Sequence, residues 1–571
     1  MGDATDTAVA FNGHDGDFIA DVYPIVTAGA DGKPTLIVTT DTEYSYLGRL
    51  VVDFDANGEL LLGTLSPVLN GAYAAAPAIV EAVFNNGQTA AQIVAASSMA
   101  TRVKAITDAI NTVIQAKDGL VYGYTKVYME GDRVFGRTQE VNLGNVTADA
   151  NAAKAKAALG LSSTNAVFSL KNGGGLRASL GSVAGNGSKI PPLANPLTGK
   201  PAGAISRLDV ENALRFDNKL IVFDTTPTGL LALLNFTAGH SSGPTAQNGG
   251  YPQVGNIRFS YEFSRPAGQR VRSAVLIDDN GTIVSKIVEN GAVLPGAQAV
   301  IPVVALNFTA NGGDGYPIKY LDPTATPPNQ IVNPETSNFR FVLNDGTLST
   351  PVARNLDFTA AAVVPATSLG EQQAFSDYLT VRHNTPAKAY DLADTVVALD
   401  TRIQQIPSRT DTSLFSPVEI WRLANFGNTA GSGANQGTLD DADSDSANNL
   451  FEFAFGTDPT SNLTGSAGLI YTGTFARGGI LTLPGQPLTQ FEAIPNNVDF
   501  RALFVRRKDY VSAGLTYIPQ FSTDLSSWQD SAATPTLLAD DGTYQVVSVP
   551  YPRFIAGRKA RFFRMLLNLT P

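Results

Sequence analysis

The stretch LNFTANGGDGYP, residues 306–317, closes an apolar run that begins at Val300, and it governs how this sequence is interpreted. Val300 to Phe308 has the length and apolar content of a buried strand. The glycines that follow permit a tight turn and let the backbone approach a ligand closely. Phe308 precedes this turn and Asp314 lies within it, so an aromatic ring and a carboxylate flank a flexible loop. The pattern indicates either a structural turn or a clamp for a flat, polar ligand.

The composition describes a globular chain with several domains. Its 571 residues are too many for a single core, so about two to four domains are expected. The formal net charge of −11 disfavours broad binding to nucleic acid. No apolar run reaches the length of about 18 residues that a membrane span requires. Cysteine is absent, which excludes disulfides, thiolate metal sites and cysteine nucleophiles.

Histidine is rare, and its distribution bears on metal chemistry. The chain has His14, His240 and His383, and no two of them share a ligand-like spacing. A two-metal hydrolase site usually draws on several histidines and carboxylates. The sequence therefore predicts no dinuclear centre, and NGHDGD at 12–17 is interpreted as a surface loop.

Hydrophobic periodicity predicts strands and helices mixed along the first 405 residues, which is typical of an α+β fold. The expected strands lie within 36–62, around a turn at 55–58, and at 167–170, 220–223, 256–263, 271–277 and 300–308. The expected helices lie at 100–117, 147–159, 228–235, 369–383 and 391–405, with Thr147 or Asp149 near the start of the second. Residues 427–449 have a linker composition, and short strand patterns from about 465 to 571 predict a small all-β domain.

Several stretches in the middle of the chain carry side chains that suit a nucleotide. The planar fork of arginine fits phosphate oxygens and stays charged. Two phenylalanines can sandwich a flat base, with stacking worth about 1–3 kcal/mol per base, and a carboxylate accepts hydrogen bonds from ribose hydroxyls. Each piece alone is more often a turn, a core ring or a solvated surface. Together they predict a substrate site formed by Arg133 and Arg137 in EGDRVFGR, Arg177 in KNGGGLR, Phe216 and Asn218 in LRFDN, the glycine turn NGGYPQVG at 248–255, and Phe308 and Asp314 in the opening stretch.

These stretches, together with VNLGN, resemble in the same order the C-terminal, substrate-binding domain of the bacterial 5′-nucleotidases, including the periplasmic UDP-sugar hydrolase / 5′-nucleotidase type. The resemblance covers roughly residues 76–365 and implies a layered α/β/β/α domain. It implies base stacking by Phe216 and Phe308, and ribose binding by Asp314. The remaining site residues take the family's other substrate-binding positions: Arg133, Arg137, Arg177, Asn218 and Gly250.

The sequence departs from that family in two respects. The family commonly has proline before and glycine after the first stacking ring, where this chain has Arg215 and Asp217. The first three of the family's four metal motifs have no recognisable counterpart here, although residues 36–62 resemble the end of its metallophosphatase domain. NGHDGD at 12–17 shares only His14 with the fourth motif, because Gly16 stands at that motif's second histidine position. We therefore expect the chain to bind a nucleoside 5′-phosphate or a nucleotide sugar. Hydrolysis would need two divalent metals in a metallophosphatase domain acting in cis or in trans.

Two questions stay open from the sequence. Whether this chain is itself an enzyme is not decided, and the alternative is a non-catalytic cell-surface or adhesion protein that retains the nucleotidase C-terminal fold. The resemblance implies a periplasmic, extracellular or cell-surface location.

A second motif lies in the acidic segment DADSDSANNLFE, residues 441–452. Its oxygen-bearing side chains have the spacing of a 12-residue EF-hand loop, with the last glutamate able to use both oxygens. The predicted Ca²⁺ ligands are Asp441, Asp443, Asp445, Asn449 and Glu452, with the carbonyl of Ala447 as a further candidate. Ser446 stands where glycine is expected. The prediction is a structural calcium site, and the alternative is an acidic, solvated linker.

Five segments follow from these observations. They are 1–75, a remnant of the metallophosphatase domain end; 76–365, the 5′-nucleotidase C-terminal domain; 366–411, closing helices; 412–464, a linker with the EF-hand-like loop; and 465–571, a C-terminal β-sandwich module.

Overall fold

The chain is described by a computed structural model, and it divides into two compact units. The structure describes residues 23–38, 46–66, 69–74, 76–84, 87–240, 247–319, 335–406, 408–462, 471–475, 479–483, 487–494, 497–540 and 542–570. One unit comprises residues 1–119 and 183–190, and the other comprises 120–182 and 191–571. The five segment boundaries expected from the sequence remain predictions.

Among its described residues, the first unit contains two antiparallel strand pairs and three helices, together with residues 183–190, which hold β8 (Lys189–Ile190) and the end of its partner β7 (Ser182–Val183). Its strands are β1 (Ile25–Ala28) with β2 (Pro34–Ile37) and β3 (Tyr46–Arg49) with β4 (Gly71–Ala74), followed along the chain by α1 (Pro77–Phe84), α2 (Ala90–Ala96) and α3 (Ser98–Asp118), with the short turn η1 (Leu62–Thr64) before β4. The expected turn at 55–58 is present, because the Asp55 carboxylate accepts hydrogen bonds from the backbone N–H groups of Asn57 and Glu59 at 2.8 Å.

Helix α3 confirms the periodicity seen at 100–117, and Ser97 caps its start by accepting from the N–H of Ala100. The apolar stripe that defined the helix is exposed: Ile106 is 61% and Val113 54% accessible. Helical spacing therefore identified the element correctly, while its apolar face is not part of a core in the described residues.

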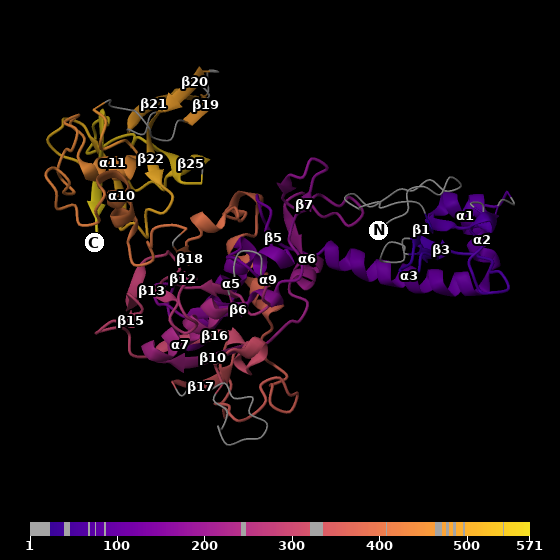
Figure 1. The fold of residues 1–571 in the computed structure, drawn as a ribbon. Helices are drawn as coiled ribbons and strands as arrows, with labels where there is room; N and C mark the ends of the chain where they lie inside the picture. The colour runs from indigo at the N-terminus through magenta and orange to yellow at the C-terminus, as the bar shows by residue number, and fades with distance from the viewer. Residues whose placement is uncertain are drawn as a thin grey trace. The chain divides into compact units, whose positions relative to one another are not determined.

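The second unit is built around two five-stranded sheets (Figure 1). The first has the order β11-β6-β16-β10-β17, formed by Pro252–Gly255, Phe168–Asn172, Ile301–Leu306, Leu220–Thr225 and Thr336–Phe341. The second has the order β15-β14-β13-β12-β18, formed by Ala292–Val293, Ile283–Glu289, Val271–Ile277, Ile257–Glu262 and Ile403–Ile406. The first sheet is covered on both faces, so its inner strands β6, β16 and β10 are buried without alternation, and β16 and β10 are largely apolar.

Helices complete the layers around the first sheet. One face shares a core with the second sheet and with α7 (Pro227–Gly239), through residues such as Phe168, Phe259 and Leu230. On the other face, Val222 and Val304 pack with Ala155 of α5 (Asn142–Leu159). The remaining elements of this region are β5 (Val121–Tyr124) with β9 (Ala204–Ser206), α4 (Arg133–Gly136), α6 (Arg207–Ala213), α8 (Asn307–Ala310), α9 (Glu371–Arg382), and the turns η2 (Gly173–Gly175), η3 (Gly313–Gly315), η4 (Pro386–Lys388) and η5 (Val397–Leu399). The expected mixture of strands and helices is confirmed.

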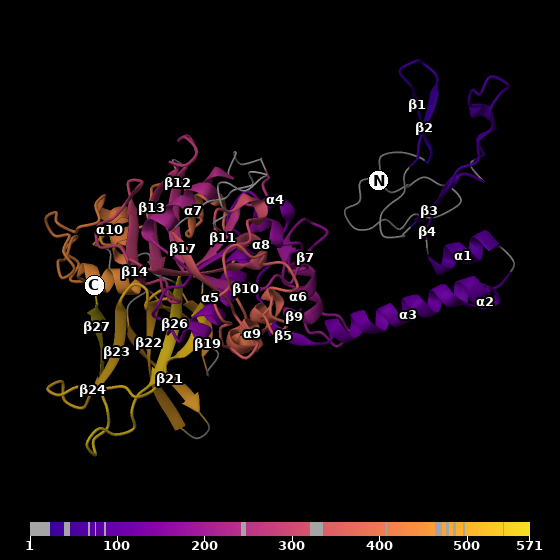
Figure 2. The ribbon, with the colours of Figure 1, turned by 90° about the horizontal axis from the view of Figure 1, so that it is seen from below.

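The C-terminal part contains two helices and further strands. Helices α10 (Pro417–Phe426) and α11 (Asn449–Phe455) precede the sheets β21-β22-β26-β25 (Leu488–Ile494, Asn497–Arg507, Tyr544–Pro550, Thr536–Asp540) and β24-β23-β27 (Gln529–Asp530, Leu515–Ser522, Phe562–Leu569), and a hairpin β19–β20 (Tyr471–Phe475, Gly479–Leu483). Figure 2 shows the strands of both sheets near one another. Both sheets and α11 share one core, which includes Phe453, Phe504 and Phe521.

Three sequence expectations about elements are corrected. Helix α5 begins at Asn142 rather than near Thr147 or Asp149, because its first N–H is bonded at 2.7 Å by the distant carboxylate of Asp394. The strand expected to reach Phe308 ends at Leu306, and Phe308 lies in the helical turn α8.

The third correction concerns residues 391–405, where a helix was expected. This segment contains the short turn η5 and then strand β18, which pairs in parallel with β12 from Phe259 opposite Ile403. The tertiary pairing outweighs the helical pattern of the segment.

Described helices include none that is both long enough and apolar enough to cross a membrane.

Candidate functional site

The register of the first sheet brings four loops to one of its ends. The start of β10 lies beside the end of β16, since Leu220 pairs with Leu306. Strand β6 runs parallel to β16, and the start of β11 pairs with the end of β6 through Pro252 and Asn172. The segments after β6 and β16 and before β10 and β11 therefore meet at one end of the sheet. These segments carry most of the site residues that the sequence singled out.

Asp314 lies at the centre of these loops. It occupies the turn η3 with a φ of 53°, and its Oδ2 accepts a hydrogen bond of 2.7 Å from the side-chain amide of Asn172 at the end of β6. Gly249 lies beside this carboxylate, since a Cβ atom there would be in ordinary contact, 3.8 Å, with either Asp314 oxygen. The opening stretch, KNGGGLR and GGYPQVG thus converge on one carboxylate.

The two phenylalanines expected to stack on a base are partly or largely exposed. Phe216 is 61% and Phe308 36% accessible, which is unusual for rings that serve only as core. The guanidinium of Arg177 lies 5.6 Å from the centre of the Phe216 ring. A Cβ atom at Gly313 would lie 2.5 Å from the Phe308 ring, so the glycine is needed for the ring to lie over the turn.

Three arginines form a positively charged cluster near Asp314. Arg133 lies in α4, whose start is capped by Asp132, and Arg137 follows that helix directly. Burial, together with the charges of Arg133 and Arg177, lowers the pKa of the Arg137 guanidinium, and Asp314 opposes that shift. The Nε atom of Arg137 is buried and has no hydrogen-bond partner among the described residues. Like charges held together around an unpaired donor suit an anionic group.

His240 belongs to this region although sequence reasoning did not select it. It follows α7, and its Nδ1 is 2.8 Å from the side-chain amide nitrogen of Asn248. Its ring lies against Gly250, where an added Cβ would be 2.8 Å from Nε2, while Tyr316 donates to the Gly250 carbonyl at 2.7 Å. Burial lowers the pKa of His240, so the imidazole is neutral at pH 7. A single histidine without a spaced partner offers no sequence signal for such a position.

Asn218 lies beside this site, and its amide serves an internal contact. Its Nδ2 is 3.4 Å from Glu371 Oε1, and its carbonyl accepts from the Glu371 N–H at 2.9 Å. Glu371 in turn forms a fully buried ion pair with Lys171 at 2.9 Å. The asparagine thus supports the segment that carries Phe216.

The two residues that depart from the family pattern differ in their surroundings. Asp217 has a φ of 45°, a conformation that favours glycine. Its carboxylate accepts from Lys219 Nζ at 2.7 Å and from the N–H of Gln372 at 3.2 Å. The negative charge of Asp217 is therefore balanced locally, whereas Arg215 is exposed to solvent.

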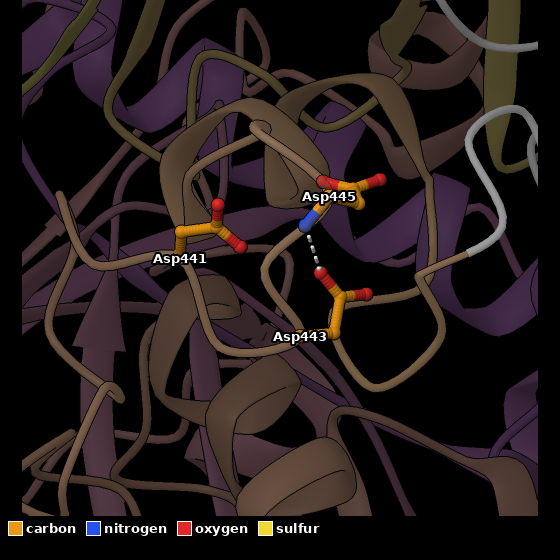
Figure 3. A group of neighbouring side chains, drawn as sticks. All are labelled: Asp441, Asp443 and Asp445. Atoms are coloured by element: carbon orange, nitrogen blue, oxygen red, sulfur yellow. Dashed lines mark hydrogen bonds between the residues drawn. The ribbon is translucent and has the colours of Figure 1, made fainter.

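The acidic loop brings its three aspartates together. One oxygen from each of Asp441, Asp443 and Asp445 lies within 4.8 Å of the others, and the N–H of Asp445 donates to Asp443 (Figure 3). Glu452 in α11 is fully buried, and neither of its carboxylate oxygens has a hydrogen-bond partner in the part of the chain that the structure describes. Burial and then the charges of Asp443, Asp445 and Asp441 raise the pKa of Glu452 to about 8.

Asn449, the remaining predicted side-chain ligand, lies three residues before Glu452 in the same helix. Its amide nitrogen donates to the carbonyls of Asn435 and Gly437 at 3.0 and 2.7 Å, and its Oδ1 is buried without a partner among the described residues. The predicted motif at 12–17, with His14, lies outside the described residues.

Known proteins match the region that carries the sheet-end site. Residues 121–319 match the 5′-nucleotidase, C-terminal domain family. The trifunctional nucleotide phosphoesterase protein YfkN of Bacillus subtilis (strain 168) is 32% identical over 198 residues, covering 34% of this chain and 11% of that protein. Protein 5NUC of Lutzomyia longipalpis is 25% identical over 300 residues, covering 52% of this chain and 44% of that protein. The chain thus aligns with less than half the length of each of these relatives.

Among solved structures, a 5′-nucleotidase precursor from Thermus thermophilus is 23% identical with a TM-score of 0.36, covering 70% of this chain and 58% of that one. Through residues 121–319, this chain is thus similar to the 5′-nucleotidase C-terminal domain family.

Proposed function

We propose that the loops at this end of the first sheet bind a nucleotide, and that the chain is the nucleotide-recognition part of a 5′-nucleotidase-type phosphoesterase. The observation that carries this proposal is the cluster of Arg133, Arg137 and Arg177 near Asp314, on the same loops as two accessible phenylalanine rings. The arginines offer positive charge for a phosphate, and the phenylalanine rings offer flat apolar surface for a base.

Each group has a distinct task in this proposal. The rings of Phe216 and Phe308 stack on the nucleobase. The Asp314 carboxylate, held by Asn172, accepts hydrogen bonds from ribose hydroxyls. The arginines bind the phosphate, with the buried Nε of Arg137 gaining the partner it otherwise lacks. The substrates proposed are nucleoside 5′-phosphates or nucleotide sugars.

Hydrolysis needs chemistry that these loops do not supply. Among described residues, the one group of three or more neighbouring metal-ligating side chains is that of Asp441, Asp443 and Asp445, in the acidic loop. We therefore propose that a metallophosphatase domain, in cis or in trans, supplies two divalent metals. This chain's residues then hold and orient the phosphate ester for attack. The family resemblance favours a periplasmic or extracellular setting.

Calorimetric titration of adenosine and AMP into the full chain tests the proposal. We expect binding of both ligands, and Phe308→Ala should weaken both by about 5- to 150-fold, the equivalent of losing one stacking contact. Phe263→Ala is the matched control, because Phe263 is a similarly accessible ring that follows strand β12, outside the sheet-end loops. Absence of binding to the unmodified chain would favour the non-catalytic surface protein instead.

A further inference from the structure

We propose that residues 441–452 bind one Ca²⁺ between the aspartate cluster and Glu452, and that this ion fastens the acidic loop to the core of the C-terminal sheets. Three neighbouring aspartates do not by themselves indicate a metal site, since exposed acidic groups are common without a metal. The burial of the Glu452 carboxylate is a second, independent indication of a bound cation.

Burial of the Glu452 carboxylate is unfavourable unless a cation balances its charge. Its side chain is fully buried and both oxygens lack hydrogen-bond partners within the described part of the chain. Buried carboxylates are otherwise paired, bonded or bound to metal, because removing the charge from water is costly. The charged groups acting on Glu452 include Asp443, Asp445 and Asp441, all of the same sign. No lysine or arginine forms an ion pair with any of these four carboxylates in the described residues.

The chemistry of the donors favours calcium. The side chains offer only oxygen: one from each aspartate, two from Glu452, and the unpartnered amide oxygen of Asn449, which shares a helix face with Glu452. Six such oxygens reach the lower end of the range that Ca²⁺ takes. Mg²⁺ requires stricter geometry and keeps several waters, so a site rich in carboxylates selects against it.

The position of Glu452 links this ion to the C-terminal core. Phe453, Ala454 and Phe455 follow it in α11 and pack with Phe504 and Val547 of the larger sheet. An ion held jointly by the loop and by Glu452 would therefore restrain α11 where it enters that core. Binding should stabilise the C-terminal sheets and leave the nucleotide loops unaffected.

Calorimetry with CaCl₂ on the chelator-treated full chain, with MgCl₂ in parallel, provides the test. We expect saturable binding of one Ca²⁺ and clearly weaker binding of Mg²⁺. Glu452→Gln and Asp443→Asn should each weaken Ca²⁺ binding at least about tenfold, because each removes a charged ligand. Asp440→Asn is the matched control: it makes the same charge change next to the loop, at a carboxylate that accepts from the N–H of Gly437 at 2.8 Å.

Hydrogen exchange supplies a second readout that locates the effect. Ca²⁺ should slow amide exchange in α11 and β22, and the unfolding temperature of Glu452→Gln should no longer respond to Ca²⁺. If Glu452→Gln does not fold, Asp443→Asn tests the same ion, because it removes a proposed ligand in the acidic loop. The proposal is overturned if about 10 mM CaCl₂, roughly ten times the dissociation constant of the weakest calcium sites, produces neither binding heat nor slower exchange in the unmodified chain. Adenosine binding measured with and without Ca²⁺ separates this outcome from failure of the nucleotide site.

Discussion

At the scale of single residues, Asp217 shows how this chain accommodates a departure from its family. Its positive φ suits glycine, and its side chain offsets the strain by bonding Lys219 and the N–H of Gln372. The local ion pair explains Asp217 as a structural residue.

Two variants separate the strain at Asp217 from its hydrogen bonds. Both Asp217→Ala and Asp217→Gly lose the carboxylate, but only glycine relieves the left-handed backbone. We expect Asp217→Ala to be less stable than Asp217→Gly by about 1 kcal/mol, measured by denaturant unfolding. Equal stabilities would show that the backbone at this position carries no strain.

Arg137 provides a residue-scale test of phosphate recognition. Arg137→Ala should weaken AMP binding by about 10- to 100-fold, the value of a hydrogen bond to a charged group, while adenosine binding changes little. Calorimetry with both ligands measures the difference. Arg272→Ala serves as the control, since Arg272 lies in the second sheet and bonds the carbonyl of Asn290 at 3.1 Å. Equal losses for adenosine and AMP would assign Arg137 to the base or ribose instead.

Asp400 predicts how stability depends on pH. Burial and the nearby charge of Glu140 raise the pKa of Asp400 from its ordinary value of 3.8 to about 8. The folded chain therefore keeps a proton that the unfolded chain releases, so this residue's contribution to stability falls as pH rises from about 4 to about 8. Asp400→Asn should flatten the dependence between pH 5 and 8 in urea unfolding. Asp345→Asn, at a carboxylate whose pKa is lowered by its bonds to Thr347, should leave that slope unchanged.

Several site residues could be named from the sequence, and others could not. Arg137, Phe308 and Asp314 lie in stretches distinctive enough for the family resemblance to select them. Asn172 and His240 were not selected from the sequence. Their contribution depends on Asp314 and Asn248, 142 and 8 residues away, which only the folded chain brings into contact with them. Their residue types carry no signal alone.

At the scale of elements, α5 is a helix whose start depends on a remote residue. No side chain near Val141 caps it, and Asp394 bonds the N–H of Asn142 from 252 residues away. Local capping rules therefore placed its beginning too late. The core strands β10 and β16 were easier to predict, because they are largely apolar runs buried on both faces. Strand β18 was missed because its pairing with β12 cannot be read locally.

The remote cap of α5 can be tested directly. Asp394→Ala should reduce the free energy of unfolding by about 1 kcal/mol, the usual value of a helix N-cap. Asp391→Ala is a nearby control that removes a partly exposed ion pair with Lys508, which should cost less. Denaturant unfolding of both variants measures the difference. Equal losses would mean that Asp394 contributes no more than a surface charge.

At the scale of the whole molecule, the strand order turns distant segments into one site. Loops from residues 133–137, 172–177, 216–218, 248–250 and 308–314 lie near one another because β6, β16 and β10 are neighbours in the sheet. The resemblance predicted this set, but the physical reason for its convergence is the register. The division into two units at residue 119 was not expected from composition.

The contacts of Gly313 with Phe308 and of Gly250 with His240 have a consequence for how this sequence can change over generations. Any side chain at position 313 would collide with the Phe308 ring, and any at 250 with the His240 ring. The glycine of each pair therefore cannot be replaced while the ring keeps its position. A lineage that lost the aromatic ring would free its glycine, so substitutions at these positions should appear in descendants as pairs, with the ring lost first.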